Sequence, residues 1–141
     1  MSVGKATSAE STREVIAKWA DSANAHSETS ALADDVVFTT MATGEEARGP
    51  EEVLQSLNFF YHVAFDAHAE PKTMVIDEGT AAVEGDFVGE HIGEFAGVPP
   101  THMRVRVPLC VVYEVENDKI KRARIYFEMP ALFQQLGVEA P

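Results

Sequence analysis

Four long runs of alternating apolar and polar residues fill the second half of the chain, and they constrain the fold more than any other feature. Their period of two residues predicts β-strands at about 68–77, 80–94, 103–116 and 119–128. Glu78-Gly79 and Asn117-Asp118 separate the outer pairs, and a loop around residues 97–101 separates the middle pair. Consecutive strands with such connections predict an antiparallel meander.

The first half of the chain shows helical spacing instead. Ser11 precedes apolar residues at helical intervals, which predicts a helix over about 11–25 with Ser11 as its N-cap. A second helix is expected from Gly49 to about Ala64, because Pro50 suits a first turn. The remaining segments predict a short helix or turn at 30–35, a strand at 36–40, a loop at 43–46 and a helical turn at 130–136 that ends at Gly137.

Helices followed by a meander are typical of an α+β domain. In this order a strongly curved antiparallel sheet wraps around the helices and makes a cone that is open at one end. We expect one domain, residues 11–141, after a flexible N-terminus of residues 1–10, because a chain of 141 residues buries a single core. A concave sheet and an amphipathic helix commonly enclose a mostly apolar pocket, so we expect a small hydrophobic molecule as the partner.

Composition disfavours several other partners. The net charge is −12 at pH 7, and phosphate backbones and anionic membranes bind mainly through Lys and Arg, so we expect neither nucleic acid nor membrane as a partner. The lone Cys110 and the lack of a signal-peptide pattern favour a cytoplasmic protein. Six of the eleven basic residues nevertheless lie close together and predict a local basic strip: Arg104, Arg106, Lys119, Lys121, Arg122 and Arg124.

The sequence contains no pattern typical of a metal or cofactor site. The five histidines have no close paired spacing and no Cys lies beside them. A nucleophile elbow and a phosphate-binding glycine motif are also missing from the sequence. We therefore expect no metal and no cofactor.

Two strands carry the candidate catalytic residues. On the last strand, alternation puts Arg124, Tyr126 and Glu128 on one face and an apolar set on the other, which taken alone makes the polar face solvated. On the strand at 80–94, the alternate residues that share one face include Gly85 and Phe87 and end in His91. A histidine there suits a hydrogen-bond donor or proton shuttle facing a pocket, and equally a residue that holds the adjoining loop through one backbone hydrogen bond.

The strand at 103–116 is apolar in its middle on both faces. A strand covered on both sides needs a second layer outside the cone, and a partner subunit is a simple source of it. We therefore predict a homodimer through the sheet.

Three motifs resemble one protein family. They are the glycine-spaced segment Gly89-Glu-His-Ile-Gly-Glu-Phe-Ala-Gly-Val-Pro-Pro-Thr101, the run Arg124-Ile-Tyr-Phe-Glu128 and the tail Gln134-Gln-Leu-Gly137. In their order and spacing the chain resembles the SnoaL-like branch of the nuclear transport factor 2-like superfamily, whose members include polyketide cyclases. The resemblance runs more weakly back to about Val15, and it also implies the cone and the dimer.

The resemblance assigns the catalytic role to Glu128, and the chemistry of the other residues suggests how they would assist it. Glu128 stands where the family usually has an aspartate that serves as catalytic acid/base at the pocket floor. Glu128 would then take a proton from a carbon next to a carbonyl, His91 would assist, and Arg124 and Tyr126 would steady the enolate oxygen. Arg124 serves equally well as an ion-pair partner for Glu114. The expected substrate-binding residues are Tyr126, Trp19, Phe38, Phe60, Phe87 and Gly85. At the position of Gly85 the family often has a bulky aromatic side chain, so the glycine would leave extra room in the pocket.

Two functions follow from the cone. The first is a cofactor-independent enzyme that uses general acid/base chemistry on a hydrophobic carbonyl compound, of the cyclase, isomerase or hydratase type. The second is a binding or accessory module that holds a small apolar ligand without chemistry. The scaffold hosts many activities, so the fold alone does not choose between them.

Overall fold

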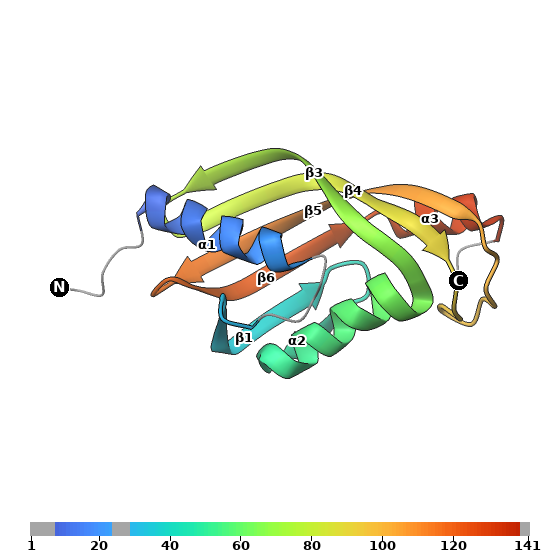
Figure 1. The fold of residues 1–141 in the computed structure, drawn as a ribbon, viewed down its shortest axis with the longest axis horizontal. Helices are drawn as coiled ribbons and strands as arrows, with labels where there is room; N and C mark the ends of the chain where they lie inside the picture. The colour runs from blue at the N-terminus through green and yellow to red at the C-terminus, as the bar shows by residue number, and fades with distance from the viewer. Residues whose placement is uncertain (1–7, 24–28, 139–141) are drawn as a thin grey trace.

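The computed structural model describes residues 8–23 and 29–138. Its elements, in chain order, are α1 (Ala9–Ala23), β1 (Leu32–Thr40), β2 (Glu45–Arg48), α2 (Gly49–Asn58), the π-helical turn η1 (Phe59–Ala64), β3 (Phe65–Asp77), β4 (Thr80–His91), β5 (Arg104–Glu116), β6 (Lys119–Phe127) and α3 (Met129–Leu136) (Figure 1). The strands form one sheet in the order β2-β1-β6-β5-β4-β3. Neighbouring strands are antiparallel except β1 and β6, which are parallel. The predicted α+β class is confirmed.

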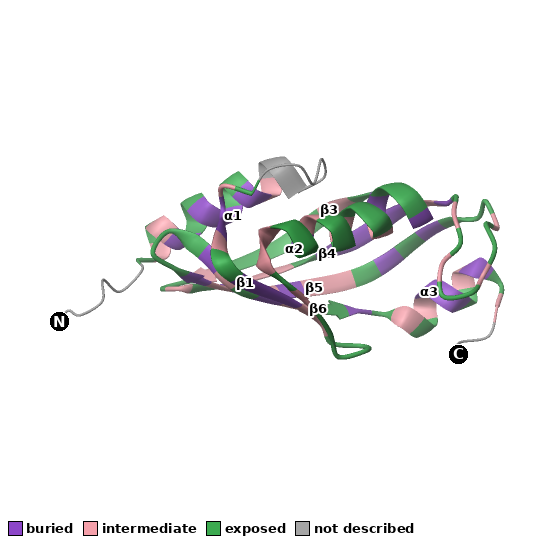
Figure 2. Ribbon diagram, turned by 90° about the horizontal axis from the view of Figure 1, so that it is seen from below, coloured by how far each residue is buried: buried purple, intermediate pink, exposed green. Residues whose placement is uncertain are grey.

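Helices α1 and α2 lie over one face of the curved sheet, and their buried residues are on the sides turned toward it (Figure 2). One core cluster forms beneath α1 around Ile16, Trp19 and Phe38. A second forms around Phe65 and Phe87 near α3. No helix in residues 8–23 and 29–138 is long and apolar enough to cross a membrane.

The start of α1 differs from the prediction. The helix begins at Ala9, and Ser8 acts as its cap, because the backbone N–H of Ser11 donates to the Ser8 Oγ at 3.0 Å. Ser11 therefore lies inside the first turn, so its predicted capping role is wrong. The rest of the predicted flexible N-terminus, residues 1–7, lies outside the described residues, as do residues 24 and 25 at the predicted end of this helix.

The segment before α2 also differs from the prediction. Strand β1 already begins at Leu32, where we expected a helix or turn over 30–35. The predicted loop at 43–46 contains the start of β2, which pairs with β1 from Thr40 opposite Glu45 to Val37 opposite Arg48. Gly44, with a φ of 79°, makes the turn between the two strands. This hairpin projects Glu45 from the sheet edge toward the helices.

The predicted helix over 49–64 changes its winding partway. Regular α-helix ends at Asn58, and the next six residues, Phe59–Ala64, form a π-helical turn. A π-turn has more residues per turn than an α-helix, so successive side chains are separated by smaller angles. Phe59, Phe60 and Tyr61 can therefore all face the same cavity.

Glycines allow the sheet to curve. A Cβ added at Gly85 would lie 2.3 Å from the Glu70 carbonyl oxygen, and one added at Gly89 would lie 2.3 Å from that of Asp66. The backbone of β3 therefore lies where side chains at these two positions of β4 would be. The register between β3 and β4 also shifts between Pro71 and Thr73, which marks a bulge in β3. Figure 1 shows the resulting bend of β3 along its length.

Helix α3 covers the part of β5 that β6 does not reach. Pairing between β5 and β6 begins at Leu109 opposite Phe127, so Arg106 has no strand beside it on that edge. The Gln135 side chain takes the place of a strand: its Nε2 donates to the Arg106 carbonyl and its Oε1 accepts the Arg106 N–H, each at 2.8 Å. These two hydrogen bonds fix α3 to the free edge of β5.

Candidate functional site

A pocket of about 1120 Å³ lies between the helices and the concave face of the sheet. Trp19 on α1 and Phe38 on β1 line it from one side, and Phe60 and Tyr61 on η1 line it from another. The sheet contributes mostly aliphatic and aromatic side chains, namely Val83, Leu109, Val111, Tyr113, Ile125 and Phe127. Such a mostly apolar hollow with a few polar groups is typical of a small-molecule site.

Aromatic rings build one wall of this pocket. Phe60 is at its centre, and its ring centroid lies 5.3 Å from that of Phe127 and 5.5 Å from that of Phe95. Phe60 also stacks on Phe87 at 4.5 Å. Because Phe60 covers Phe87, Phe87 is fully buried in the core and is not part of the pocket lining.

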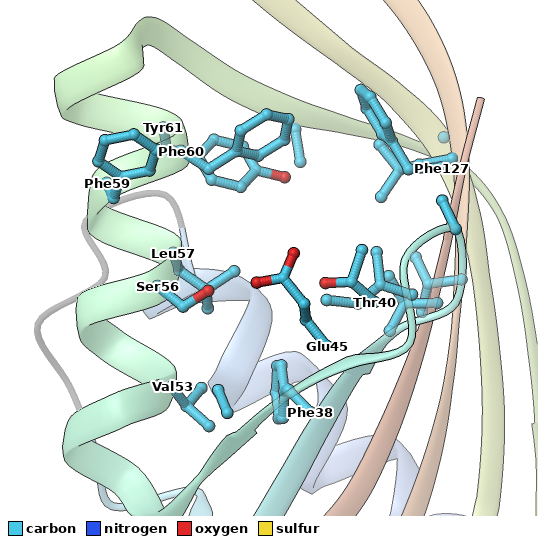
Figure 3. A pocket seen from close by; sticks show the side chains of 18 of the residues that line it. Phe38, Thr40, Glu45, Val53, Ser56, Leu57, Phe59, Phe60, Tyr61 and Phe127 are labelled. Atoms are coloured by element: carbon cyan, nitrogen blue, oxygen red, sulfur yellow. The ribbon is translucent and has the colours of Figure 1, made fainter. Parts of the chain in front are cut away.

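Glu45 is the carboxylate that reaches into this apolar space. Figure 3 shows its side chain pointing into the middle of the pocket, with the hydroxyls of Thr40, Ser56 and Tyr61 around the same space. Its backbone N–H donates to the Thr43 Oγ1 at 3.2 Å, which steadies the hairpin that carries it. No ion pair to Glu45 exists among the described residues. Glu45 is itself an exposed residue, so water reaches its carboxylate.

Two buried tyrosines also line the pocket. Burial raises the pKa of Tyr113 to about 12, and a hydrogen bond from Trp19 opposes that rise in part. Burial is also the main cause that raises the pKa of Tyr61, and the nearby Tyr113 adds to it. Both phenols therefore keep their protons near neutral pH. A protonated phenol donates hydrogen bonds, so Tyr61 is suited to bind an oxygen of a ligand.

The structure places Glu128 outside the pocket. Strand β6 turns Ala123, Ile125 and Phe127 toward the cone and ends at Phe127, so Glu128 follows as the exposed residue that precedes α3. It does not line the pocket. The expectation from the resemblance that Glu128 lies at the pocket floor is wrong, whereas simple alternation along the strand predicted its solvated position.

Arg124 and Tyr126 share the outer side of β6 with Glu128. Arg124 forms an ion pair with Glu114 on β5, the alternative considered for it, and Tyr126 is 46% exposed. Neither lines the pocket, so their expected place beside the substrate is wrong. Ion pairs likewise offset part of the predicted basic strip, because Arg106 pairs with Asp86 and Glu70 and Lys121 pairs with Asp35.

His91 is fully buried at the end of β4 and does not line the pocket. Its Nδ1 accepts the backbone N–H of Thr101 at 3.1 Å and lies 3.0 Å from the Thr101 Oγ1. Burial is the main cause that lowers the pKa of His91. Its place in a pocket-facing row was predicted incorrectly, and the alternative, a histidine that holds the adjoining loop, agrees with these contacts.

The expected substrate-binding residues divide into two groups. Trp19, Phe38 and Phe60 line the pocket, and Gly85 does so too. Gly85 does not enlarge it, however, because the β3 backbone occupies the space that a side chain would need. Phe87 lies behind Phe60, and Tyr126 lies on the other face of the sheet.

Sequence reasoning missed Glu45 and Tyr61. Glu45 was assigned to a loop, although Thr43-Gly44 directly after a β-branched strand is a possible hairpin turn that would have directed attention to it. Tyr61 lies inside the helix predicted over 49–64, and the helical pattern there gives no sign of the π-turn that carries it. Within residues 8–23 and 29–138, no three His, Cys, Asp or Glu residues are grouped so that they could hold a metal ion.

The fold and the pocket define a cone-shaped α+β domain of the ketosteroid isomerase and nuclear transport factor 2-like kind. The chain belongs to the SnoaL-like polyketide cyclase family, whose model matches residues 10–136. No curated protein sequence matches it.

Solved structures share the fold at low sequence identity. A protein from Jannaschia sp. CCS1 assigned as a SnoaL-like polyketide cyclase is 15% identical with a TM-score of 0.77, covering 94% of each chain. IdmH from Streptomyces antibioticus, assigned as a polyketide cyclase, is 23% identical with a TM-score of 0.75, covering 90% of this chain and 99% of the other. An LEH-like epoxide hydrolase from M. tuberculosis is 18% identical with a TM-score of 0.69, covering 92% and 90%. Similar folds thus carry different reactions.

Proposed function

We propose that this protein is an enzyme that uses general acid/base chemistry on a small, largely apolar carbonyl compound, with Glu45 as the proton-transfer residue. The observation that carries the proposal is the Glu45 carboxylate, which points into an aromatic-walled pocket and has no ion-pair partner among the described residues. Membership of the SnoaL-like family supports a reaction of the cyclase or isomerase type.

The proposed reaction begins with proton abstraction. A Glu45 carboxylate oxygen takes the proton from the carbon next to the substrate carbonyl, and the electron pair of that C–H bond moves to give an enolate. The Tyr61 hydroxyl donates a hydrogen bond to the enolate oxygen, where the negative charge develops. In an isomerisation, Glu45 returns the proton to another carbon. In a ring closure, the enolate carbon forms a bond to a second carbonyl carbon, and the new alkoxide takes up the proton that Glu45 removed, which restores the carboxylate.

The walls of the pocket favour flat, apolar substrates. Phe60, Phe127 and Trp19 present rings to the cavity, and ring-shaped ligands stack well on such surfaces. The polar groups lie together around Glu45, so a substrate that places its carbonyl there leaves its apolar part among the rings (Figure 3). This orientation brings the acidic C–H group and the carboxylate together.

A binding module without chemistry is the second candidate. The exposure of Glu45 to water favours it, because a solvated carboxylate lacks the dry surroundings that many catalytic carboxylates have. In that case the pocket holds the ligand through the same aromatic walls, and Glu45 only orients it.

The exchange of α-hydrogens for deuterium distinguishes the two candidates. We suggest 2-tetralone, an aromatic ketone of suitable shape, incubated with the protein in D₂O and followed by proton NMR. The enzyme proposal predicts accelerated exchange that falls by roughly 100-fold or more in Glu45→Gln, because the amide cannot take the proton.

The matched control is Glu128→Gln, the same chemical change at the exposed carboxylate before α3, and it should leave the exchange unchanged. Exchange that survives in Glu45→Gln would exclude Glu45 as the base. Binding of 2-tetralone without any acceleration would favour the binding module.

We also propose a homodimer through the outer face of the sheet. Cys110, Val112 and Tyr126 form a partly exposed apolar centre there, and no described helix covers it. A second copy that packs on this face would bury that centre. Light scattering during size-exclusion chromatography should show a dimer for the wild type and a monomer for Val112→Lys, with Lys18→Glu on the exposed side of α1 as the control. A monomeric wild type would refute this assembly.

A further inference from the structure

The charged residues that line the pocket are all acidic. Of the described residues that line it, none is Lys, Arg or His, whereas five carry a carboxylate: Glu45, Glu46, Glu52, Glu70 and Asp86. The whole chain has a net charge of −12, so its overall field has the same sign. A negative opening on a negative protein repels anions and attracts cations.

Three of the five carboxylates are neutralised by ion pairs. Asp86 lies 2.8 Å from both the Lys72 Nζ and the Arg106 Nη1. Glu70 lies 3.0 Å from the same Arg106 nitrogen. Glu46 forms an ion pair with Arg48.

The two remaining carboxylates lie on the β2–α2 side of the pocket. Glu52 accepts the backbone N–H of Arg48 at 3.1 Å, but no cation among the described residues pairs with it or with Glu45. Val53 and Ser56, which follow Glu52 on α2, point into the same space as Glu45 (Figure 3). Glu45 on β2 and Glu52 in the first turn of α2 are therefore the lining carboxylates that no described cation offsets.

Aromatic faces strengthen this preference. Trp19, Phe38 and Phe60 line the cavity, and the negative face of an aromatic ring attracts a cation. A ligand cation would thus meet both carboxylates and aromatic rings in the lining, with no basic group of the described lining to repel it. A ligand carboxylate or phosphate would find no cationic partner there.

We propose that the substrate carries a protonated amine beside its apolar body, with the ammonium group near Glu52 and Glu45, and that the pocket excludes carboxylate and phosphate ligands. The carbonyl part of this substrate rests on the proposed function, whereas the charge preference rests on the lining alone. The natural ligand is then an amine-bearing apolar carbonyl compound.

Three naphthalene probes with the same ring test the charge preference: 2-naphthylmethylamine, which is protonated at pH 7, the neutral 2-naphthalenemethanol and the anion 2-naphthoate. Isothermal titration calorimetry in about 20 mM salt should show the amine binding roughly tenfold more tightly than the alcohol, and 2-naphthoate binding more weakly than both. The gap should narrow in about 300 mM salt, because salt screens partly exposed charges.

Variants locate the source of the preference. The double variant Glu45→Gln, Glu52→Gln should bring the amine and the alcohol to within about twofold of each other, since both uncompensated charges are removed. Glu128→Gln removes one charge outside the pocket and should keep the tenfold gap, which separates a local effect from one of net charge.

Two outcomes would overturn the inference. Equal affinities of amine and alcohol in the wild type would show that the lining does not select charge, and failure of the amine to bind at millimolar concentration would do the same. Neither outcome affects the deuterium exchange of neutral 2-tetralone, so the proposed acid/base chemistry succeeds or fails separately.

Discussion

Replacing Gly85 with alanine tests the physical reason for the curvature of the sheet. The added Cβ would lie 2.3 Å from the Glu70 carbonyl oxygen and 2.8 Å from the Pro71 Cα. Both are backbone atoms of β3, so no side-chain rotation relieves the contact. Strand β3 would have to move away from β4, which disturbs the pairing of the two strands and the wall of the pocket.

The expected cost follows from the severity of this contact. Overpacking in a core typically costs about 1–3 kcal/mol, and a clash with backbone belongs at the upper end, so we expect a loss of about 3 kcal/mol. Unfolding entropy of about 2.1 cal/mol/K per residue converts this loss, for a chain of 141 residues, into a fall in Tm of roughly 10 °C.

Urea unfolding followed by the fluorescence of Trp19, the one tryptophan of the chain, measures this loss. Gly44→Ala is the matched control: Gly44 has a φ of 79° and nothing within 4 Å of an added Cβ, so it should show only backbone strain of about 1 kcal/mol. A Gly85→Ala variant within about 0.5 kcal/mol of the wild type would refute the close approach of β3 and β4.

Two further perturbations concern the ends of the cone. Gln135→Ala removes both hydrogen bonds to the Arg106 backbone and should cost about 2 kcal/mol in urea unfolding, whereas Gln134→Ala at the exposed neighbouring position should change little. Burial lowers the pKa of His91 from 6.5, so the unfolded chain takes up this proton first, and stability should decline as the pH falls below about 6.5. His91→Asn keeps an acceptor for the Thr101 N–H and should remove this part of the pH dependence of unfolding; an unchanged pH dependence would contradict the assignment.

Local chemistry explains why the elements could be predicted from the sequence. Period-two alternation marked the strands from residue 68 onward, and helical spacing around Val15 and Trp19 marked α1, because both patterns reflect which side chains a single element can bury. The closing turn at Gly137 was also visible, since its left-handed conformation with a φ of 78° favours glycine. The motifs around His91 and in the Gln134–Gly137 tail were sufficient to indicate the family.

The candidate site was predicted less well, because a family motif gives a position along the chain and not the direction of a side chain. The resemblance placed Glu128 in the pocket, but β6 ends one residue earlier and directs Ile125 and Phe127 inward. Alternation, a purely local argument, gave the correct orientation of that strand. Trp19, Phe38 and Phe60 line the pocket, since large apolar side chains on amphipathic elements face the interior in any compact arrangement, and their contact with a substrate stays a prediction.

By itself, then, the amino-acid order determined most of the helices and strands and, along β6, which side chains face inward, because those depend on side chains within a few positions of one another. Only the tertiary structure decided which polar group reaches the cavity. Glu45 enters the cavity because β2 pairs with β1. Position 85 requires glycine because the backbone of β3 occupies the space that a side chain there would need. Such contacts join segments that are distant in the chain, so no local pattern encodes them.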